Sequence, residues 1–287
     1  MMQKILVLGI KGMAGHVIFN SLPNLGNYNV YGLARNIEPT EKIFNLDVSN
    51  TKGLKVILDL KFDIIINCIG ILNKDAEDNP DKAIWFNSYF PHLLEAITKN
   101  TPTRVISIST DCVFSGKKGD YTEADFRDGE GYYSRSKSMG EIINKKDLTI
   151  RTSIIGPELN KKGIGLFNWF MLQNNFISGY SKAFWSGITT VELSKVIHQT
   201  IEQEIKGLII VAGSIKISKF DLLGLFNFIF REDSVNIIEN SEYSVDKSMV
   251  TERKDFNYIA PSYKTMLLEM KEWILKNDSL YTHYNIH

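Results

Sequence analysis

The sequence predicts an α/β fold, in which a doubly wound parallel sheet carries a smaller, interleaved α/β lobe. Two observations support this prediction. Continuous apolar runs alternate with stretches of helical length as far as residue 155, and the alternation loosens after it. Such runs are typical of strands that are buried on both faces. Strand–helix–strand repeats at this spacing form right-handed crossovers within a parallel sheet.

The individual elements follow from the same pattern. The apolar runs predict strands at 4–9, 28–33, 63–67, 104–109, 148–154 and 207–212. The segments of helical length between and before them are 12–22, 50–60, 80–99, 133–146 and 189–205. The last strand and the helix before it extend the sheet after an interruption.

Two segments that lack the regular alternation, 156–187 and 214–287, predict the smaller lobe. Residues 156–187 hold Pro157 and a cluster of aromatic side chains, and residues 214–287 hold helical stretches near 218–230 and 261–276 around an irregular middle. We therefore expect a dinucleotide-binding domain of residues 1–155 plus about 188–213, and a substrate-binding lobe of about 156–187 plus 214–287.

Composition excludes several functional classes. The 33 basic and 33 acidic residues balance, so the chain lacks the basic surplus of a nucleic-acid-binding protein. Two cysteines, Cys68 and Cys112, argue against a disulfide scaffold and fit a reducing cytosol. No apolar run has the length of a membrane span, and no signal-peptide pattern opens the chain, so we expect a cytoplasmic protein. The five histidines are scattered, and no protein metal site is expected.

A glycine-rich turn directly follows the first predicted strand and opens a helix. It contains Gly9, Gly12 and Gly15. Glycines there let the backbone approach a pyrophosphate, whose charge meets the N-terminal amides of the helix. The turn therefore predicts a Rossmann dinucleotide site. The alternative is a tight strand-to-helix connection that binds no ligand.

The end of the second strand indicates which dinucleotide is bound. An acidic residue there would hold the ribose 2′-hydroxyl of NAD. This chain instead has Arg35, which suits a 2′-phosphate, and Lys11 in the glycine turn could add a second positive charge. These residues favour NADP(H), and the alternative is that Arg35 is a solvated surface residue.

Tyr133 and Lys137 place a phenol and an ammonium four residues apart, on one face of a predicted helix. About one such pair arises by chance in a chain of this composition, and Tyr243 and Lys247 form a second. Position favours Tyr133, because it follows the strand at 104–109, whose C-terminal end faces the cofactor crevice. Thr110 closes that strand, and its hydroxyl could bind a carbonyl oxygen beside the tyrosine.

In combination, these motifs resemble the extended short-chain dehydrogenase/reductase superfamily. Within it, the chain is similar to the dTDP-4-dehydrorhamnose reductase branch, which acts on nucleotide-linked 4-keto-6-deoxysugars. The strings that carry the resemblance are the glycine turn, Ser-Thr-Asp-Cys-Val-Phe-Ser-Gly at 109–116, Tyr-x-x-x-Lys with Gly140 and Glu141, and Arg-Thr-Ser-Ile-Ile-Gly-Pro at 151–157. A further segment of that branch, Gly-x-Pro-Thr, matches 187–190 without its proline. The resemblance fades over the last 75 residues or so, where sugar and base are chosen.

The resemblance implies a mechanism and a set of site residues. NADPH would deliver hydride to C4 of the keto-sugar while Tyr133 protonates the developing alkoxide, Lys137 lowers the tyrosine pKa from about 10, and Thr110 orients the carbonyl. The implied cofactor-binding residues, which include the catalytic pair, are Gly9, Lys11, Gly12, Met13, Gly15, Arg35, Asp47, Val48, Cys68, Ile69, Gly70, Asn87, Ser109, Tyr133, Lys137 and Ile154. The implied substrate-binding residues are Asn73, Asp111, Phe114, Arg151, Lys182 and Trp185.

Cys112 departs from the reductase pattern, which commonly has tyrosine at this place. Sister enzymes that both epimerise and reduce carry cysteine here, and a thiolate can remove the proton next to a ketone. Such epimerases need a second acid/base, for which Lys161, Lys162 and Lys182 are available, although none aligns well. The alternative is a small buried cysteine without a chemical role.

The sequence thus predicts an NADPH-dependent 4-reductase of a nucleotide-linked 4-keto-6-deoxyhexose or 2-acetamido-2,6-dideoxyhexulose, which also epimerises it and serves glycan biosynthesis. UDP is preferred to dTDP as the carrier, because the strings at 151–159 and 185–190 resemble those of capsule-type homologues. The alternatives are a 4-epimerase or 4,6-dehydratase with bound NAD, and a non-catalytic NADP-binding regulatory subunit. The resemblance also implies a homodimer formed through the 80–99 and 133–146 helices.

Overall fold

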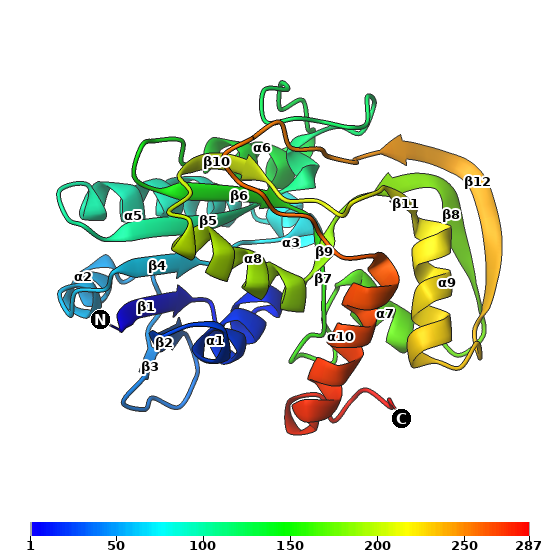
Figure 1. The fold of residues 1–287 in the computed structure, drawn as a ribbon, viewed down its shortest axis with the longest axis horizontal. Coiled ribbons are helices and arrows are strands. Elements are labelled where there is room, and N and C mark those ends of the chain that lie inside the picture. The colour runs from blue at the N-terminus through cyan, green and yellow to red at the C-terminus, as the bar shows by residue number, and fades with distance from the viewer. Residues whose placement is uncertain (1, 287) are drawn as a thin grey trace. The chain divides into compact units, whose positions relative to one another are not determined.

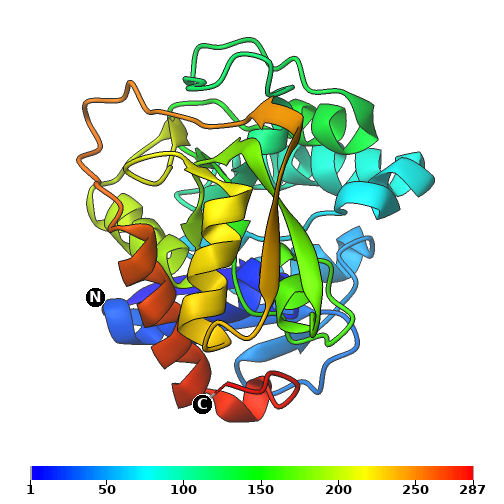
Figure 2. The same ribbon diagram turned by 90° about the vertical axis from the view of Figure 1, so that its right-hand side faces the viewer.

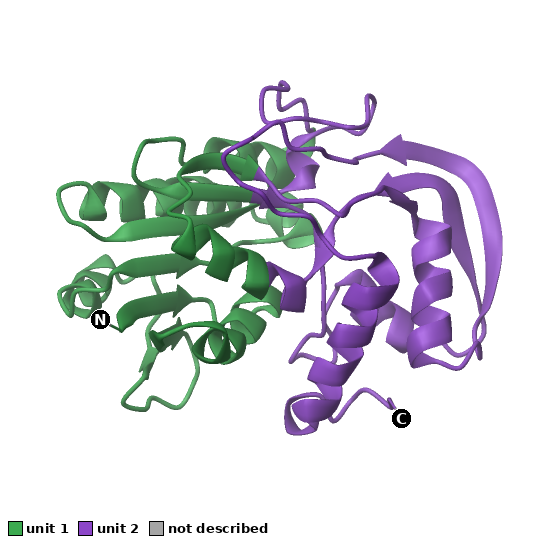
Figure 3. Ribbon diagram, in the orientation of Figure 1, with its two compact units in different colours: residues 1–109, 130–150, 194–209 green, residues 110–129, 151–193, 210–287 purple. Residues whose placement is uncertain are grey.

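The computed structural model of the chain describes residues 2–286, which form two compact units (Figure 3). Of the described residues, unit 1 contains 2–109, 130–150 and 194–209, and unit 2 contains 110–129, 151–193 and 210–286. The segment 110–129 groups with unit 2, whereas the sequence analysis places it in the dinucleotide-binding domain. Contacts within unit 2 explain this grouping, because the Tyr121 amide donates to the Ser248 carbonyl at 2.9 Å.

Unit 1 is built on a seven-stranded sheet with the order β10-β6-β5-β4-β1-β2-β3, and helices lie on both of its faces (Figure 1). The pairs β1/β2, β1/β4, β2/β3 and β4/β5 are parallel. This arrangement confirms the predicted doubly wound fold. The strand bounds are β1 (Gln3–Leu8), β2 (Tyr28–Ala34), β3 (Ile43–Asn45), β4 (Ile64–Asn67), β5 (Arg104–Thr110), β6 (Leu148–Thr152) and β10 (Gly207–Ile210).

The apolar runs form these strands because both faces of the sheet are covered. Ile5, Leu6, Val7 and Leu8 of β1 are fully buried. The helices that belong wholly or mainly to unit 1 are α1 (Met13–Leu25), α2 (Thr51–Leu58), α3 (Asn73–Asp78), α4 (Pro80–Ala83), the π-helical turn η1 (Ile84–Tyr89), α5 (Phe90–Thr98), α6 (Gly131–Met139) and α8 (Thr190–Glu202).

Two predicted helices and one predicted strand differ in detail from the elements that the structure shows. The segment 80–99 is not one regular helix, because η1 separates α4 from α5. The helix predicted at 133–146 ends at Met139, where Gly140 lies so close to η1 that a Cβ would be 1.8 Å from the Asn87 carbonyl oxygen. The strand predicted at 148–154 is interrupted at Ser153, which separates β6 from the short strand β7 (Ile154–Ile155).

Unit 2 contains a second sheet with the order β11-β8-β12, in which β8 (Phe176–Trp185) pairs in parallel with β12 (Asn236–Asp246) and antiparallel with β11 (Ile217–Ser218) (Figure 2). Helix α9 (Lys219–Phe230) packs on β8, and α7 (Leu166–Met171) and α10 (Tyr263–Lys276) pack on α9. The remaining elements are η2 (Asp111–Val113), β9 (Ile188–Thr189), which pairs with β7, and η3 (Asp278–Leu280).

The sequence analysis missed β8 and β12. Every second residue of β8 is at least partly exposed, and β12 is mostly exposed, so neither strand forms the continuous apolar run that marked the sheet of unit 1. Within residues 2–286, no helix combines the length and the apolarity needed to cross a bilayer.

Candidate active site

The glycine turn of unit 1 is held in a conformation that only glycines allow. Gly9 has φ +87°, in the left-handed region that side chains disfavour. A Cβ on Gly15 would lie 2.2 Å from the Gly9 carbonyl oxygen, so the turn and the first residues of α1 are in direct contact. The Gly12 amide closes the turn by donating to that carbonyl at 2.9 Å. The backbone can therefore approach a pyrophosphate closely at the N-terminus of α1.

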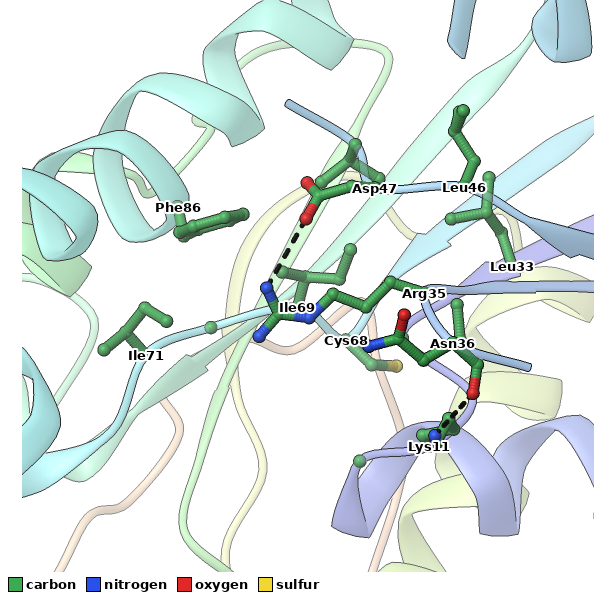
Figure 4. A pocket seen from close by; sticks show the side chains of 15 residues that line it. Lys11, Leu33, Arg35, Asn36, Leu46, Asp47, Cys68, Ile69, Ile71 and Phe86 are labelled. Carbon is green, nitrogen blue, oxygen red and sulfur yellow. Dashed lines mark hydrogen bonds and ion pairs between the residues drawn. The ribbon is translucent and has the colours of Figure 1, made fainter. Parts of the chain in front are cut away.

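This turn borders a cavity of about 280 Å³ (Figure 4). The cavity brings together these predicted cofactor-binding residues: Gly9, Lys11, Gly12, Arg35, Asp47, Val48, Cys68, Ile69 and Gly70. Its lining also includes residues that the sequence analysis did not name: Leu33, Ala34, Asn36, Leu46, Ile71 and Phe86. Of the predicted cofactor-binding residues, Met13, Gly15, Asn87, Ser109, Tyr133, Lys137 and Ile154 do not line it.

The charged side chains that line this cavity suit a phosphorylated ribose. The Arg35 side chain is 67 % exposed, and its ion pair with Asp47 is long, at 3.4 Å. Asp47 is held mainly by Ser49, whose amide and hydroxyl donate to Oδ1 at 3.0 and 2.8 Å, and these bonds lower the pKa of its carboxyl. The Lys11 ammonium donates to the Asn36 carbonyl at 2.8 Å. Because β2 ends without an acidic residue, the site fits NADP(H) better than NAD.

Lys137 lies beside this cavity with its ammonium buried. Its Nζ donates to the Ile108 carbonyl at 2.6 Å and lies 4.0 Å from the position that a Cβ on Gly70 would occupy. Burial lowers the pKa of Lys137 to about 8, although the nearby Glu141 and Cys68 act to raise it. Burial raises the pKa of the Cys68 thiol to about 12, so this cysteine is uncharged near neutral pH where it lines the cavity.

Tyr133 is positioned by the first turn of α6. Gly131 begins this helix with φ +82°, and the Glu77 carboxylate accepts hydrogen bonds from the amides of Tyr132 and Tyr133, both at 3.0 Å. These two bonds lower the pKa of Glu77 and cap α6 from a different helix, α3. The sequence analysis missed Glu77, because a cap supplied by a distant helix leaves no spacing signal next to the helix that it caps.

Asn87 ties the edge of the cavity to α6. Its Oδ1 accepts from the Ile71 amide at 2.8 Å, and its Nδ2 donates to the Ile71 carbonyl at 2.9 Å and to Ser136 Oγ at 3.1 Å. The side chain is almost wholly buried. These bonds make Asn87 a brace between the cavity wall at Ile71 and α6. Ser109 has a similar structural use, since its hydroxyl donates to Glu141 at 2.7 Å.

Unit 2 has a cavity of its own, of about 480 Å³. Cys112 and Asp111 line it, together with Lys219, Lys247 and the aromatic side chains Trp169, Tyr180, Phe184, Trp185 and Tyr243. Sequence reasoning set Tyr243 and Lys247 aside as a chance pair and did not consider Lys219. Most of these residues lie on β8, β12 and α9 or next to them, so their proximity depends on a sheet that the sequence did not reveal.

The thiol of Cys112 differs from the expected thiolate. Burial, together with the nearby Asp111 carboxylate, raises its pKa to about 11, while Lys247 opposes the shift, in part through a hydrogen bond to the thiol. A thiol with this pKa keeps its proton near neutral pH, which favours a role as proton donor over the expected thiolate base. The Thr110 hydroxyl is engaged locally, since it donates to Asp111 at 3.0 Å and accepts from the Cys112 amide at 3.1 Å.

The other predicted substrate residues have varied surroundings. Phe114 and Arg151 are buried, with the guanidinium 5.0 Å from the centre of the ring, and neither lines a cavity described above. Asn73 begins α3 with φ +41°, also outside both cavities. Lys161, Lys162 and Lys182 are exposed and lie outside the cavity that holds Cys112. Trp185 lines that cavity.

Residues 2–286 contain no group of three or more His, Cys, Asp or Glu side chains that could hold a metal ion.

Comparisons with known proteins fit this geometry. The family model of the RmlD substrate binding domain matches residues 2–222. The structure of a dTDP-4-dehydrorhamnose reductase from Bacillus anthracis in complex with NADP is similar, with a TM-score of 0.79 and 20% identity over 96% of this chain and 99% of that one. A hypothetical dTDP-4-dehydrorhamnose reductase from Sulfolobus tokodaii has a TM-score of 0.72 and 25% identity over 86% and 91% of the two chains.

The fold is also similar to that of enzymes with other reactions. The dTDP-glucose 4,6-dehydratase of Bacillus anthracis in complex with NAD has a TM-score of 0.73 and 15% identity over 96% of this chain and 98% of that one. None of the curated proteins matches the chain. At this level of identity the solved structures establish the fold, and the reaction must be argued from the residues.

Proposed function

Because the chain belongs to the family of the RmlD substrate binding domain, we propose that it is an NADPH-dependent 4-reductase of a nucleotide-linked 4-keto-6-deoxyhexose. The observation that carries this proposal is the position of Lys137. Its buried ammonium adjoins Gly70 at the wall of the cavity with the glycine turn, and the same helix carries Tyr133 one turn earlier. Reduction of a ketone by a bound dinucleotide also requires a proton donor, and a cation on the same helix makes the Tyr133 phenol a better one.

The residues around the cavity would hold the cofactor in a defined way. The turn at Gly9 and Gly12 would accept the pyrophosphate, and Arg35 with Lys11 would bind the 2′-phosphate. Bound NADPH supplies the hydride that adds to the sugar ketone. The Arg35 guanidinium is accessible for this role, because it is mostly exposed and its ion pair with Asp47 is long.

Tyr133 would donate the proton that the developing alkoxide needs. An ordinary phenol has a pKa near 10, which is too high for efficient acid catalysis at neutral pH. A cation near the phenol lowers that pKa, and Lys137 is mostly protonated at pH 7 because its own pKa is about 8. Glu77 fixes the start of α6 and thereby the backbone of Tyr133.

The finer parts of the proposal concern the substrate. We propose that the enzyme also epimerises the sugar next to its ketone, to give a 6-deoxy-L-sugar nucleotide, and that the cavity of unit 2 receives the sugar. Cys112 lines this cavity, and the aromatic side chains of its walls offer apolar faces to a sugar ring or a base. UDP is the preferred carrier and dTDP the other. We further propose a cytoplasmic homodimer that serves glycan biosynthesis.

An NADPH oxidation assay tests the proposed function. The purified protein is mixed with NADPH and either dTDP-4-dehydrorhamnose or its UDP-linked 2-acetamido counterpart, and the absorbance of NADPH is followed. Consumption of NADPH with formation of a 6-deoxysugar nucleotide is the expected result. A protein that retains NAD through purification and converts these substrates without consuming NADPH would instead be an epimerase or a dehydratase.

A further inference from the structure

Two lysines of unit 2 line the same cavity as Cys112, and the sequence analysis gave neither a role. Lys219 is the first residue of α9, and Lys247 directly follows β12. Lys247 hydrogen-bonds the Cys112 thiol. Lys219 interacts electrostatically with both Asp111 and Cys112. The cavity therefore contains a thiol, a carboxylate and two amines close together.

The surroundings of Lys219 are unusual for a lysine. Its ammonium lies 4.7 Å from the centre of the Trp185 ring, and among residues 2–286 no group forms a hydrogen bond or a close ion pair with it. A buried ammonium that lacks such partners is costly, so its neutral form becomes accessible. Burial lowers the pKa of Lys219 to about 8, even though Asp111 and Cys112 act to raise it. Near pH 8 about half of the molecules therefore carry a free amine with a lone pair.

The pKa of Cys112 is shifted in the opposite direction, upward. Its pKa of about 11 means that it holds a proton over the whole range in which Lys219 can lose one. Neighbouring groups whose environments push their pKa values apart in this way form an acid/base pair, in which the amine accepts protons and the thiol donates them. The other titratable side chains that line this cavity are Asp111, Lys247, Tyr180 and Tyr243.

We propose that Lys219 is the base and Cys112 the acid that together invert the carbon next to the substrate ketone. This inference rests on the proposed function, since it needs a keto-sugar in the cavity of unit 2. It replaces Lys161, Lys162 and Lys182 as the second acid/base, because those three lysines are exposed and do not line the cavity.

The proposed inversion balances without any redox change. The neutral Lys219 amine takes the proton from the carbon next to the ketone, and the electron pair of that bond moves onto the carbonyl oxygen to give an enolate. The Cys112 thiol then delivers its proton to the opposite face of the same carbon, and the carbonyl re-forms. The pair is left as ammonium and thiolate, and it resets when the Lys219 proton passes to Cys112, either directly or through solvent.

Solvent exchange tests this assignment. The enzyme is incubated with NADP⁺ and either dTDP-4-dehydrorhamnose or its UDP-linked 2-acetamido counterpart in deuterated water, and deuterium in the sugar is measured by mass spectrometry. Without a hydride donor, only enolisation can incorporate the label. We expect exchange with the wild type, and a rate that rises with pH through about 8 as the Lys219 amine loses its proton. Lys219→Met and Cys112→Ser should each lower the rate by about 100-fold or more, the usual contribution of general acid–base catalysis.

Matched variants show whether Lys219 acts as a base or only contributes a positive charge. Lys219→Arg keeps the charge but cannot lose its proton near neutral pH, so it should lose exchange as Lys219→Met does. Exchange restored by arginine would overturn the proposal, because Lys219 would then act as a cation. Lys276→Met, which alters an exposed lysine of α10, should exchange like the wild type. Thermal unfolding and NADPH binding show whether each variant is folded, and exchange that survives in a folded Lys219→Met protein would also overturn it.

A parallel NADPH oxidation assay distinguishes failure of the Lys219–Cys112 assignment from failure of the proposed reductase function. A wild type that reduces the ketone without incorporating deuterium would overturn the Lys219–Cys112 assignment and leave the reductase intact. A wild type that neither reduces nor exchanges either substrate would refute the proposed function itself.

Discussion

Replacing Asn87 by leucine removes the brace between the dinucleotide cavity and α6. The change leaves a side chain of similar size in a site that is 1% exposed, so little cavity is created. It deletes the hydrogen bond that the Ile71 amide donates to Asn87 at 2.8 Å, and the bonds that Asn87 donates to the Ile71 carbonyl and to Ser136 Oγ at 2.9 and 3.1 Å. Ser136 still donates to the Tyr133 carbonyl at 3.1 Å, so the main loss falls on the two backbone groups of Ile71.

The expected cost follows from those two groups. A buried polar group that loses its partner costs about 1–3 kcal/mol, and Ile71 is only half-buried, so the low end applies to each group. We expect Asn87→Leu to lower the free energy of unfolding by about 2–3 kcal/mol and the Tm by roughly 4–10 °C. Ile71 lines the cavity, so NADPH should also bind more weakly.

Thermal unfolding and a fluorescence titration with NADPH measure both effects. Asn20→Leu is the matched control, because Asn20 is exposed on α1 and, within residues 2–286, donates only to the His16 carbonyl. Its free energy of unfolding should change by no more than about 0.5 kcal/mol. Asn87→Leu with the Tm and the NADPH affinity of the wild type would refute the reasoning that this side chain braces the site.

Substitutions at three further positions test the site of unit 1. Arg35→Asp should weaken NADPH binding by about 1.5–3 kcal/mol, the scale of a hydrogen bond to a charged group, and affect NADH less; equal losses for the two dinucleotides in titrations would contradict the 2′-phosphate role. Glu77→Ala removes both acceptors from the start of α6 and should lower kcat by up to about 100-fold while the Kd of NADPH changes little, whereas Glu77→Gln, which keeps an acceptor, should lose less. The wild-type rate of NADPH oxidation should fall as the pH rises through about 8, because Lys137 then loses the proton that makes it a cation, and Lys137→Arg should move this fall to higher pH; an unchanged pH profile in Lys137→Arg would assign the titration to another group.

The sheet of unit 1 could be predicted because each of its signals lies within a short segment of the sequence. Strands buried on both faces leave continuous apolar runs, and the turn that binds a pyrophosphate needs glycines at fixed places, so Gly9 and Gly15 could be found without a structure. Arg35 could be found for a similar reason, because the end of the second strand is a fixed position in this fold.

The cavity of unit 2 could not be predicted in this way. Its residues come from segments far apart in the chain, such as Cys112, Trp185, Lys219 and Lys247, and they meet only because β8 pairs with β12 and α9 packs on β8. The alternating or exposed character of those strands hides them from a search for apolar runs. The pKa shifts of Cys112 and Lys219 depend on burial, which also has no local signature.

The most direct test of the central claim follows the hydride itself. NADPH that carries deuterium at both C4 positions of the nicotinamide ring is incubated with the enzyme and a nucleotide-linked 4-keto-6-deoxyhexose in ordinary water, and the sugar product is analysed by mass spectrometry and NMR. The account predicts one deuterium at C4 of the sugar for each NADPH oxidised, and a rate at least about 100-fold lower in Tyr133→Phe. Oxidised cofactor without deuterium in the sugar, or a Tyr133→Phe protein as fast as the wild type, would contradict it.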